Sequence, residues 1–232
     1  MKAQGLYDPR YEHDSCGAGF VVNIKGERSH QIIEHGLQVL LNLAHRGACG
    51  SEHNSGDGAG ILFQLPHQFF QKVAQEAGFS LPEPGWYGVG MIFLPQDEPL
   101  RAQCEKVLTD IIEEEGQSIL SWRDVPTLDA TLGKTARDCQ PVMRQVFIQR
   151  NQEIADDLAF ERKLFVIKNR VETTVRHLGV HESDNFYIAS MSYRTIVYKG
   201  MLTCEQVEEY FPDLKDPLVD TAIILVHSRF ST

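Results

Sequence analysis

Apolar and polar positions recur along this chain with two different periods, which predict both helices and strands. One set recurs three and four residues apart, as expected for one apolar face of a helix: Ile33, Leu37, Leu40, Leu41 and Ala44. Ser29 suits the N-cap of this helix, because its hydroxyl can accept a hydrogen bond from a free backbone N–H. We expect the helix to run to about His45 and to end near Gly47, in the left-handed conformation that glycine tolerates.

The same pattern along the chain predicts a mixed order of further elements. Helices are expected over 67–77, 98–115, 154–178 and 204–210. Strands are expected over 20–24, 61–65, 86–94, 118–123, 142–149, 186–192, 194–198 and 221–230. Strand 20–24 should be buried, strands 186–192 and 194–198 should pair, and strand 221–230 should be central. An α/β layered fold follows, and one large domain is favoured for a chain of 232 residues.

Composition and charge narrow the function classes. Hydrophobic residues make up 42% of the chain, charged residues 23%, and the formal net charge is −10. Such acidity opposes nonspecific binding to nucleic acid, and no apolar stretch is long enough to predict a membrane span. The five cysteines are odd in number and widely spaced: Cys16, Cys49, Cys104, Cys139 and Cys204. We therefore expect a reduced, cytoplasmic chain with no disulfide framework, metal site or iron–sulfur cluster in this segment.

Cys16 stands at the junction between a polar leader and an apolar run. The leader, residues 1–15, lacks the apolar segment of a secretory signal. If it is removed after Ser15, Cys16 gains a free α-amino group, and such groups in peptides have a pKa of about 7.7–8.0. That amine can act as the base for the thiol of the same residue. The alternative is an inert, buried cysteine that begins a core strand.

Two arginines and three histidines are further candidates. Arg46 follows the first predicted helix, and a positive charge there interacts favourably with the negative end of the helix dipole. Arg229 follows a buried strand, and its planar fork can hold a carboxylate or form an intramolecular salt bridge. A histidine could also serve Cys16 as a base, as in cysteine–histidine hydrolases, and three are candidates for that role: His45, His53 and His227.

The glycine-rich run 56–60 has the wrong context for a dinucleotide-binding fingerprint. That fingerprint needs a strand before the glycines and a helix after them. Here a predicted helix precedes the glycines and a strand follows them. We interpret Asp57 within this run as structural support.

Several motifs in order resemble one family, the glutamate synthase large subunit with its N-terminal class II glutamine amidotransferase domain. The motifs lie at 14–20, 44–48, 55–61, 194–200 and 227–232. The resemblance implies a four-layer αββα N-terminal-nucleophile hydrolase sandwich, truncated at its C-terminal side. It divides the chain into a propeptide-like leader, 1–15, and an incomplete amidotransferase domain, 16–232.

The resemblance also implies a reaction and its residues. Cys16 would be the nucleophile that hydrolyses L-glutamine to glutamate and ammonia, and the parent enzyme would pass the ammonia to 2-oxoglutarate. Arg229 would hold the substrate α-carboxylate, and Arg46 and Gly47 would lie next to the nucleophile. FMN and an iron–sulfur cluster are implied for the rest of the parent enzyme. Implied partners are the downstream synthase domains and a small reductase subunit or ferredoxin, in the cytoplasm or a plastid.

One part of the family site is not found in the sequence. The resemblance places the oxyanion donors, an Asn-Gly pair, beyond Thr232, so we expect the isolated chain to be inactive or nearly so. Two alternatives stay open: a non-catalytic docking or regulatory module with the amidotransferase shape, and a Cys–His hydrolase that acts with its leader attached.

Overall fold

The computed structural model describes residues 17–47, 52, 54–180 and 185–229. The helices are α1 (His30–Asn42), α2 (His67–Ala77), α3 (Glu98–Glu114), α4 (Lys134–Asp138), α5 (Asp157–His177) and α6 (Gln206–Tyr210), with 3₁₀ turns η2 (Ala44–Arg46) and η4 (Pro212–Lys215). The strands are β1 (Ala18–Val22), β2 (Ala59–Gln64), β3 (Tyr87–Leu94), β4 (Ser118–Asp124), β5 (Val142–Gln149), β6 (Tyr187–Ser192), β7 (Thr195–Gly200) and β8 (Ile223–His227).

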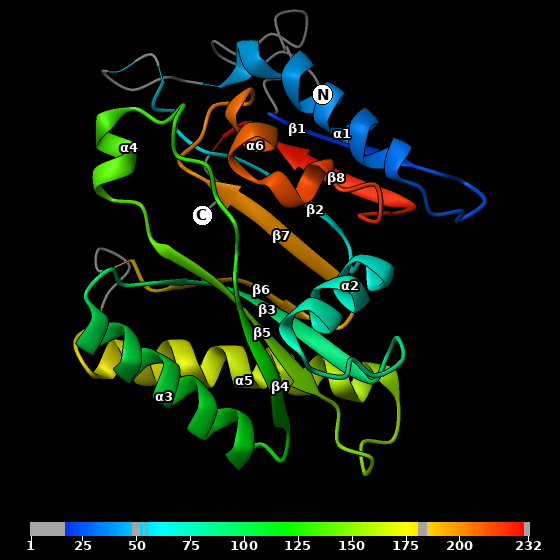
Figure 1. The fold of residues 1–232 in the computed structure, drawn as a ribbon, viewed down its shortest axis with the longest axis vertical. Coiled ribbons are helices and arrows are strands. Elements are labelled where there is room, and N and C mark those ends of the chain that lie inside the picture. Colours follow the sequence, from blue (N-terminus) through cyan, green and yellow to red (C-terminus); the bar gives the residue numbers. More distant parts are fainter. Residues whose placement is uncertain (1–16, 48–51, 53, 181–184, 230–232) are drawn as a thin grey trace, which may run out of the picture.

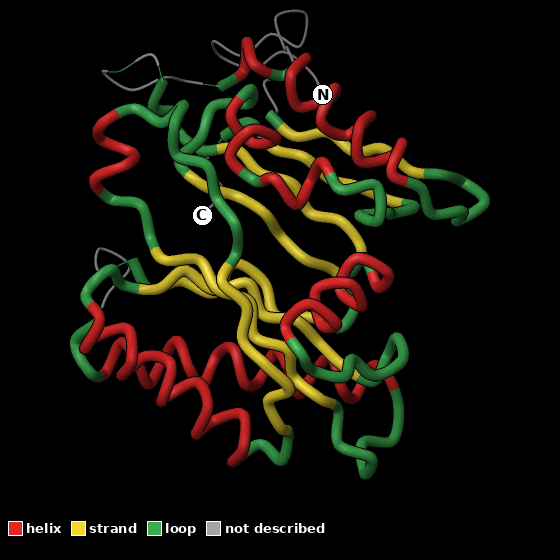
Figure 2. Tube along the Cα trace, in the orientation of Figure 1, coloured by secondary structure: helices red, strands yellow, loops and turns green. Residues whose placement is uncertain are grey.

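The strands form two antiparallel sheets stacked between helices. The first sheet has the order β1-β8-β2-β7, and the second sheet has the order β4-β5-β3-β6. In Figure 1, α1 lies above the first sheet, and α3 and α5 lie below the second. Figure 2 shows both sheets between these helices. This arrangement confirms the predicted αββα class, and the interior position of β8 confirms the predicted central strand.

Helix α1 packs closely on the first sheet because glycines face the contact from both sides. A methyl group on Gly36 of α1 would lie 2.5 Å from Cδ1 of Ile224 in β8. A methyl group on Gly19 of β1 would lie 2.8 Å from Cγ1 of Val39. Real Cβ atoms do not come that close to a neighbour, so glycine is required at both positions for this separation of helix and sheet.

Two apolar cores hold the layers together. One joins α1, the first sheet and α2 to the inner face of the second sheet, where Phe70 of α2 meets Phe147 of β5 edge-on at a centroid distance of 5.2 Å. The other lies between the second sheet and the helices α3 and α5, around Leu108, Leu164 and Ile148. Apolar burial on both faces of the second sheet makes it the more deeply covered of the two.

A buried polar network ties the two sheets to each other. Arg123 of β4 donates to both carboxylate oxygens of Asp213 in η4, each at 2.7 Å. The hydroxyl of Tyr198 in β7 donates to Asp213 at 2.8 Å, and the side-chain amide of Gln145 in β5 donates to Tyr198 at 2.9 Å. Burial, and then the Asp213 carboxylate, raise the pKa of Tyr198, so the phenol keeps its proton. Each buried polar group in the network therefore has a partner.

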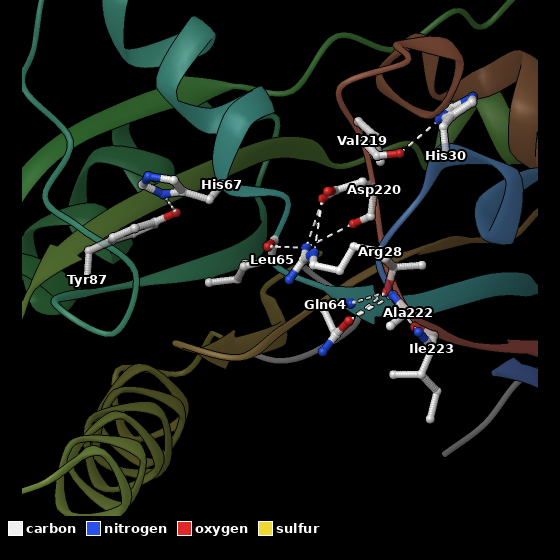
Figure 3. Close-up of polar contacts among 11 residues, drawn as sticks. Arg28, His30, Gln64, Leu65, His67, Tyr87, Val219, Asp220, Ala222 and Ile223 are labelled. Carbon is white, nitrogen blue, oxygen red and sulfur yellow. Dashed lines mark hydrogen bonds and ion pairs between the residues drawn. The ribbon is translucent and has the colours of Figure 1, made fainter. Parts of the chain in front are cut away.

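Figure 3 shows the polar contacts around the start of β8. One Nη of Arg28 donates to the carbonyls of Leu65 and Asp220, at 2.7 and 2.9 Å, and to the Asp220 carboxylate at 3.0 Å. The side-chain oxygen of Gln64 accepts the backbone N–H of Ala222 at 2.9 Å. These contacts link the segments before α1, after β2 and before β8, and so set where β8 begins.

The element predictions were mostly confirmed, with four corrections. Ser29 is the N-cap residue of α1, but its hydroxyl makes no capping hydrogen bond. Strand β1 is not buried: it lies at the edge of its sheet, and Phe20 is 67% exposed. Helix α1 ends at Asn42, and Gly47 follows η2 in an extended conformation with φ −74°, not in the left-handed region. The predicted pair 186–192 and 194–198 is also wrong, because β6 and β7 belong to different sheets.

A short turn between β6 and β7 explains the last correction. The hydroxyl oxygen of Ser192 accepts the backbone N–H groups of Arg194 and Thr195, at 2.9 and 3.3 Å. Glu161 of α5 accepts from the Ser192 hydroxyl and from the N–H of Tyr193. These bonds turn the chain out of the second sheet, so that β7 pairs with β2 instead of returning along β6.

Candidate functional site

The structure brings together three segments that the sequence analysis singled out. Cys16 itself lies outside the described residues, but Gly17, the next residue, leads directly into β1. In the first sheet Ala18 pairs with His227, so the chain entering β1 lies beside the chain leaving β8. Gly17 is thereby placed against Ser228 and Arg229, more than 200 residues further along the chain.

Ser228 is the residue on which these segments meet. Its backbone N–H donates to the carbonyl of Gly17 at 2.7 Å, and its hydroxyl donates to the same carbonyl at 3.2 Å. A methyl group on Gly47 would lie 3.2 Å from the carbonyl oxygen of Ser228. Ser228 is only 2% exposed, so water competes little for these bonds.

Arg229 passes over Gly17 at the surface of the molecule. A methyl group on Gly17 would lie 3.1 Å from Cγ and 3.3 Å from Cδ of Arg229, so the arginine stem covers the space that a side chain would need. Arg229 is exposed. A guanidinium in this position is open to a solute carboxylate, and its stem contacts Gly17, the residue that follows Cys16 in the chain.

Arg46 and Gly47 lie at the end of η2, which continues the chain after α1. The backbone N–H of Arg46 bonds to the carbonyl of Leu43 at 2.8 Å, and that of Gly47 bonds to Ala44 at 3.1 Å. The Arg46 side chain is exposed. Gly47 lies against the Ser228 carbonyl. The place of Arg46 and Gly47 beside the nucleophile and the electrostatic role of Arg46 stay predictions.

The three histidines proposed as alternative bases have different settings. His45 is exposed within η2, and His53 lies outside the described residues. His227 is half-buried on β8, in register with Gly60 of β2, which is also paired with Lys199 of β7. Burial, and then the charge of Lys199, lower the pKa of His227. Its imidazole is therefore neutral at neutral pH, the form that accepts a proton.

His227 also faces a cavity bounded by both sheets. The cavity has a volume of about 390 Å³ and a mostly apolar lining that includes Phe93, Met143 and Leu202. Its polar lining includes Lys199, whose ammonium donates to the Tyr187 hydroxyl at 3.0 Å. Gly58 at the start of β2 is part of the same wall, whereas the neighbouring Asp57 is exposed in the bend before that strand.

Sequence reasoning missed Ser228. The motif 227–232 and its arginine were singled out in the sequence, but no role was predicted for Ser228 within it. The available signal was a small hydroxyl residue directly between a buried strand and a surface arginine. Its importance depends on Gly17, a partner that is 211 residues away in the chain.

Neither a metal-binding group nor a membrane-spanning helix is found in the part of the chain that the structure describes. Within it, no three histidine, cysteine or carboxylate side chains are grouped so as to hold a metal ion. No helix of the described ranges has both the length and the apolar character needed to cross a membrane.

The chain is similar to a known protein family and to several known proteins. The family model described as class II glutamine amidotransferases matches residues 16–232. The chain is 48% identical over 231 residues to the NADPH glutamate synthase large chain of Bacillus subtilis (strain 168). It is 39% identical over 237 residues to the NADH glutamate synthase of Schizosaccharomyces pombe, and 36% identical over 235 residues to the chloroplastic ferredoxin-dependent glutamate synthase 2 of Arabidopsis thaliana.

These three alignments cover the whole of this chain but only a small part of each relative. The matched share is 100% of this chain in every case, and 15%, 11% and 14% of the three relatives in the order above. The chain therefore spans no more than 15% of the length of these curated relatives.

Proposed function

The chain belongs to the class II glutamine amidotransferase family, and from this premise we propose that it is the glutamine-hydrolysing part of a glutamate synthase. The observation that carries the proposal is the meeting of Gly17, Gly47 and Arg229 at Ser228. It sets the residue after the predicted nucleophile against the arginine predicted to hold the substrate.

In the proposed reaction, Cys16 attacks the side-chain amide of L-glutamine. Removal of residues 1–15 frees the α-amino group of Cys16, which accepts the thiol proton. The thiolate adds to the amide carbon, the carbon–nitrogen bond breaks, and the nitrogen leaves as ammonia with the proton that the amine returns. Water then cleaves the γ-glutamyl thioester and yields glutamate and the free thiol.

In this proposal, Arg229 recognises the substrate and Arg46 acts on the nucleophile. Arg229 is exposed beside Gly17, and its two parallel N–H groups match the α-carboxylate of glutamine. Arg46, one residue before Gly47, adds positive charge that favours the thiolate over the thiol. The oxyanion donors would be supplied by residues beyond Thr232, and losing one such donor typically costs about 10²–10³ in rate.

We further propose that the ammonia is passed to 2-oxoglutarate by synthase domains outside this chain. FMN and an iron–sulfur cluster would belong to those domains. The electron donor differs among the relatives, whose names specify NADPH, NADH and ferredoxin. A small reductase subunit or ferredoxin is the corresponding partner, and the cytoplasm or a plastid is the corresponding location.

The test is the intact mass of the protein before and after treatment with a diazo-ketone analogue of glutamine. The mass is measured for this chain and for the full-length protein that contains it. We expect the full-length protein to lack residues 1–15 and to gain one adduct on Cys16, and we expect Cys16→Ala to gain none. The same measurement on this chain alone tests whether residues 1–232 suffice for the reaction.

Other outcomes would replace the proposal with one of the open alternatives. An adduct on Cys16 with the leader still attached would favour a histidine base, with His227 as the first candidate because its imidazole is neutral. No adduct on the full-length protein, with no release of ammonia from glutamine, would favour the non-catalytic docking module.

A further inference from the structure

The carbonyl of Gly17, just before β1, accepts one hydrogen bond more than the pairing of β1 with β8 requires. It accepts two hydrogen bonds from a single residue, the backbone N–H of Ser228 at 2.7 Å and the Ser228 hydroxyl at 3.2 Å. The regular ladder between β1 and β8 begins one residue later, with Ala18 and His227. The hydroxyl bond is therefore an addition to the pairing of the two strands.

This extra bond acts on the most flexible joint next to Cys16. Glycine has more backbone freedom than any other residue, so an unrestrained Gly17 could adopt many conformations. Ser228 fixes the carbonyl side of Gly17, and the stem of Arg229 covers its Cα from above. Because Ser228 is buried, both bonds lie in surroundings of low dielectric constant, where hydrogen bonds are stronger than in water.

The same serine also sets two other parts of the site. Arg229 follows Ser228 directly, and Gly47 packs against the Ser228 carbonyl. A shift of Ser228 would therefore move Gly17, Arg229 and Gly47 relative to one another. Catalysis is sensitive to such shifts, since a misplacement of about 1 Å can cost on the order of 100-fold in rate.

We propose that Ser228 is a positioning residue for the proposed reaction: its hydroxyl holds the Gly17 carbonyl and so sets the spacing between the chain that enters β1 and Arg229. The role rests on the proposed glutaminase function. It also explains why residue 17 is a glycine, because a methyl group there would lie 2.8 Å from the Ser228 hydroxyl oxygen and would break this lock.

The test compares Ser228→Ala with a matched control in the full-length protein. Ser192→Ala is the control, because Ser192 is also buried and its hydroxyl is also hydrogen-bonded, but to Glu161 in the other half of the molecule. We expect Ser228→Ala to lower kcat for glutamine hydrolysis, and the limiting rate of Cys16 alkylation by the diazo-ketone, by about tenfold. KM should stay within about twofold, because the backbone bond still holds Arg229 in place. Ser192→Ala should lower only the thermal midpoint.

A second pair of variants separates the lock from a general loss of packing. Gly17→Ala should lower kcat and also raise KM, since its methyl group meets both Ser228 and the Arg229 stem. Adding Ser228→Ala to Gly17→Ala removes the oxygen that the methyl group would meet. If the lock is the cause, the double variant loses less kcat than the product of the two single losses.

The outcomes distinguish this role from the function on which it rests. If the unmodified protein is alkylated at Cys16 and Ser228→Ala lowers kcat no more than Ser192→Ala does, the positioning role is wrong and the function stands. A rise in KM with unchanged kcat would also overturn it, because Ser228 would then act on Arg229 alone. If the unmodified protein is not alkylated at Cys16, the function and the positioning role fail together.

Discussion

The two sheets have the same number of strands and the same antiparallel pairing, yet β3 of the second sheet is buried far more completely than β1 and β8 of the first. Every residue of the central strand β3 in the second sheet is buried except the half-buried Phe93. In the first sheet, each residue of β1 is exposed or half-buried, and β8 alternates between buried and more exposed positions. The alternation arises because α1 covers one face of β1 and β8, where Ile224 meets Gly36. The opposite face carries the paired residues Phe20 and Leu225.

The difference in burial indicates that the second sheet matters mainly for stability, whereas one end of the first sheet carries the candidate site. The second sheet has apolar side chains packed on both of its faces, and their burial stabilises the fold. The first sheet positions Gly17, Ser228 and Arg229 at one end of its less covered strands. Substitutions in the second sheet should therefore lower the free energy of unfolding, and substitutions at the end of the first sheet should lower activity.

The largest effect is expected where the sheets are joined. Asp213→Ala removes the carboxylate that neutralises Arg123 and leaves a guanidinium that is 13% exposed without its partner. Breaking a buried ion pair in this way costs about 3–5 kcal/mol. Denaturant unfolding measures the loss. The matched control is Asp110→Ala in the exposed pair with Lys106, which should cost about 0.5 kcal/mol or less. Equal losses for the two variants would show that the network does not join the sheets.

A matched pair of isoleucines tests the comparison of the sheets directly. Ile148 of β5 is 0% exposed and Ile223 of β8 is 42% exposed. Ile148→Ala should cost about 2–5 kcal/mol, because it loses buried area and leaves a cavity. Ile223→Ala should cost less than about 1 kcal/mol, since much of its side chain is already in water. Both values come from the same denaturant titration, and a ratio near one would contradict the unequal burial of the two sheets.

The elements that could be predicted from the sequence are those with a local signal. The bounds of α2 and β5 agree with the expected ranges 67–77 and 142–149, because helical spacing after Pro66 and a continuous apolar run are visible within a few residues. The assignment of β6 and β7 to different sheets was not predictable in this way. It depends on the bonds of Ser192 to the turn and to Glu161, which no periodicity reveals.

The residues of the candidate site also fall into those with a local sequence signal and those without one. Arg46, Gly47 and Arg229 were found because they lie in motifs that can be read along the chain, and the structure brings Gly47 and Arg229 together at Ser228. Cys16 stays a sequence prediction, outside the described residues. Ser228 was missed because its partner, Gly17, is close only after β1 and β8 have paired. Contacts between distant segments are set by sheet register, and register depends on the whole fold.

Arg229→Lys should change activity without changing stability. Lysine keeps the positive charge but loses the planar fork, so binding of the α-carboxylate should weaken and KM for glutamine should rise by about 10–100-fold. The free energy of unfolding should stay within about 0.5 kcal/mol, because the side chain is exposed. Arg162→Lys, at an exposed position on α5, is the control and should leave KM unchanged. An unchanged KM in Arg229→Lys would remove this arginine from the binding site.

The smallest effect is expected from pH, through His227. Burial, and then Lys199, lower the pKa of this histidine in the folded state, while the unfolded chain keeps a value of about 6.5. Between the two values the unfolded state binds more protons, so stability falls as pH falls from about 7.5 through 6.5. His67, whose pKa is lowered mainly by burial, adds to the same loss.

We expect His227→Gln to show a smaller drop in thermal midpoint between about pH 7.5 and about pH 5.5 than the unmodified chain, and to keep the part that comes from His67. Adding His67→Gln should reduce the drop again. An identical drop in all three proteins would mean that neither histidine is kept neutral by the fold, and the half-buried setting of His227 beside the cavity would then need another explanation.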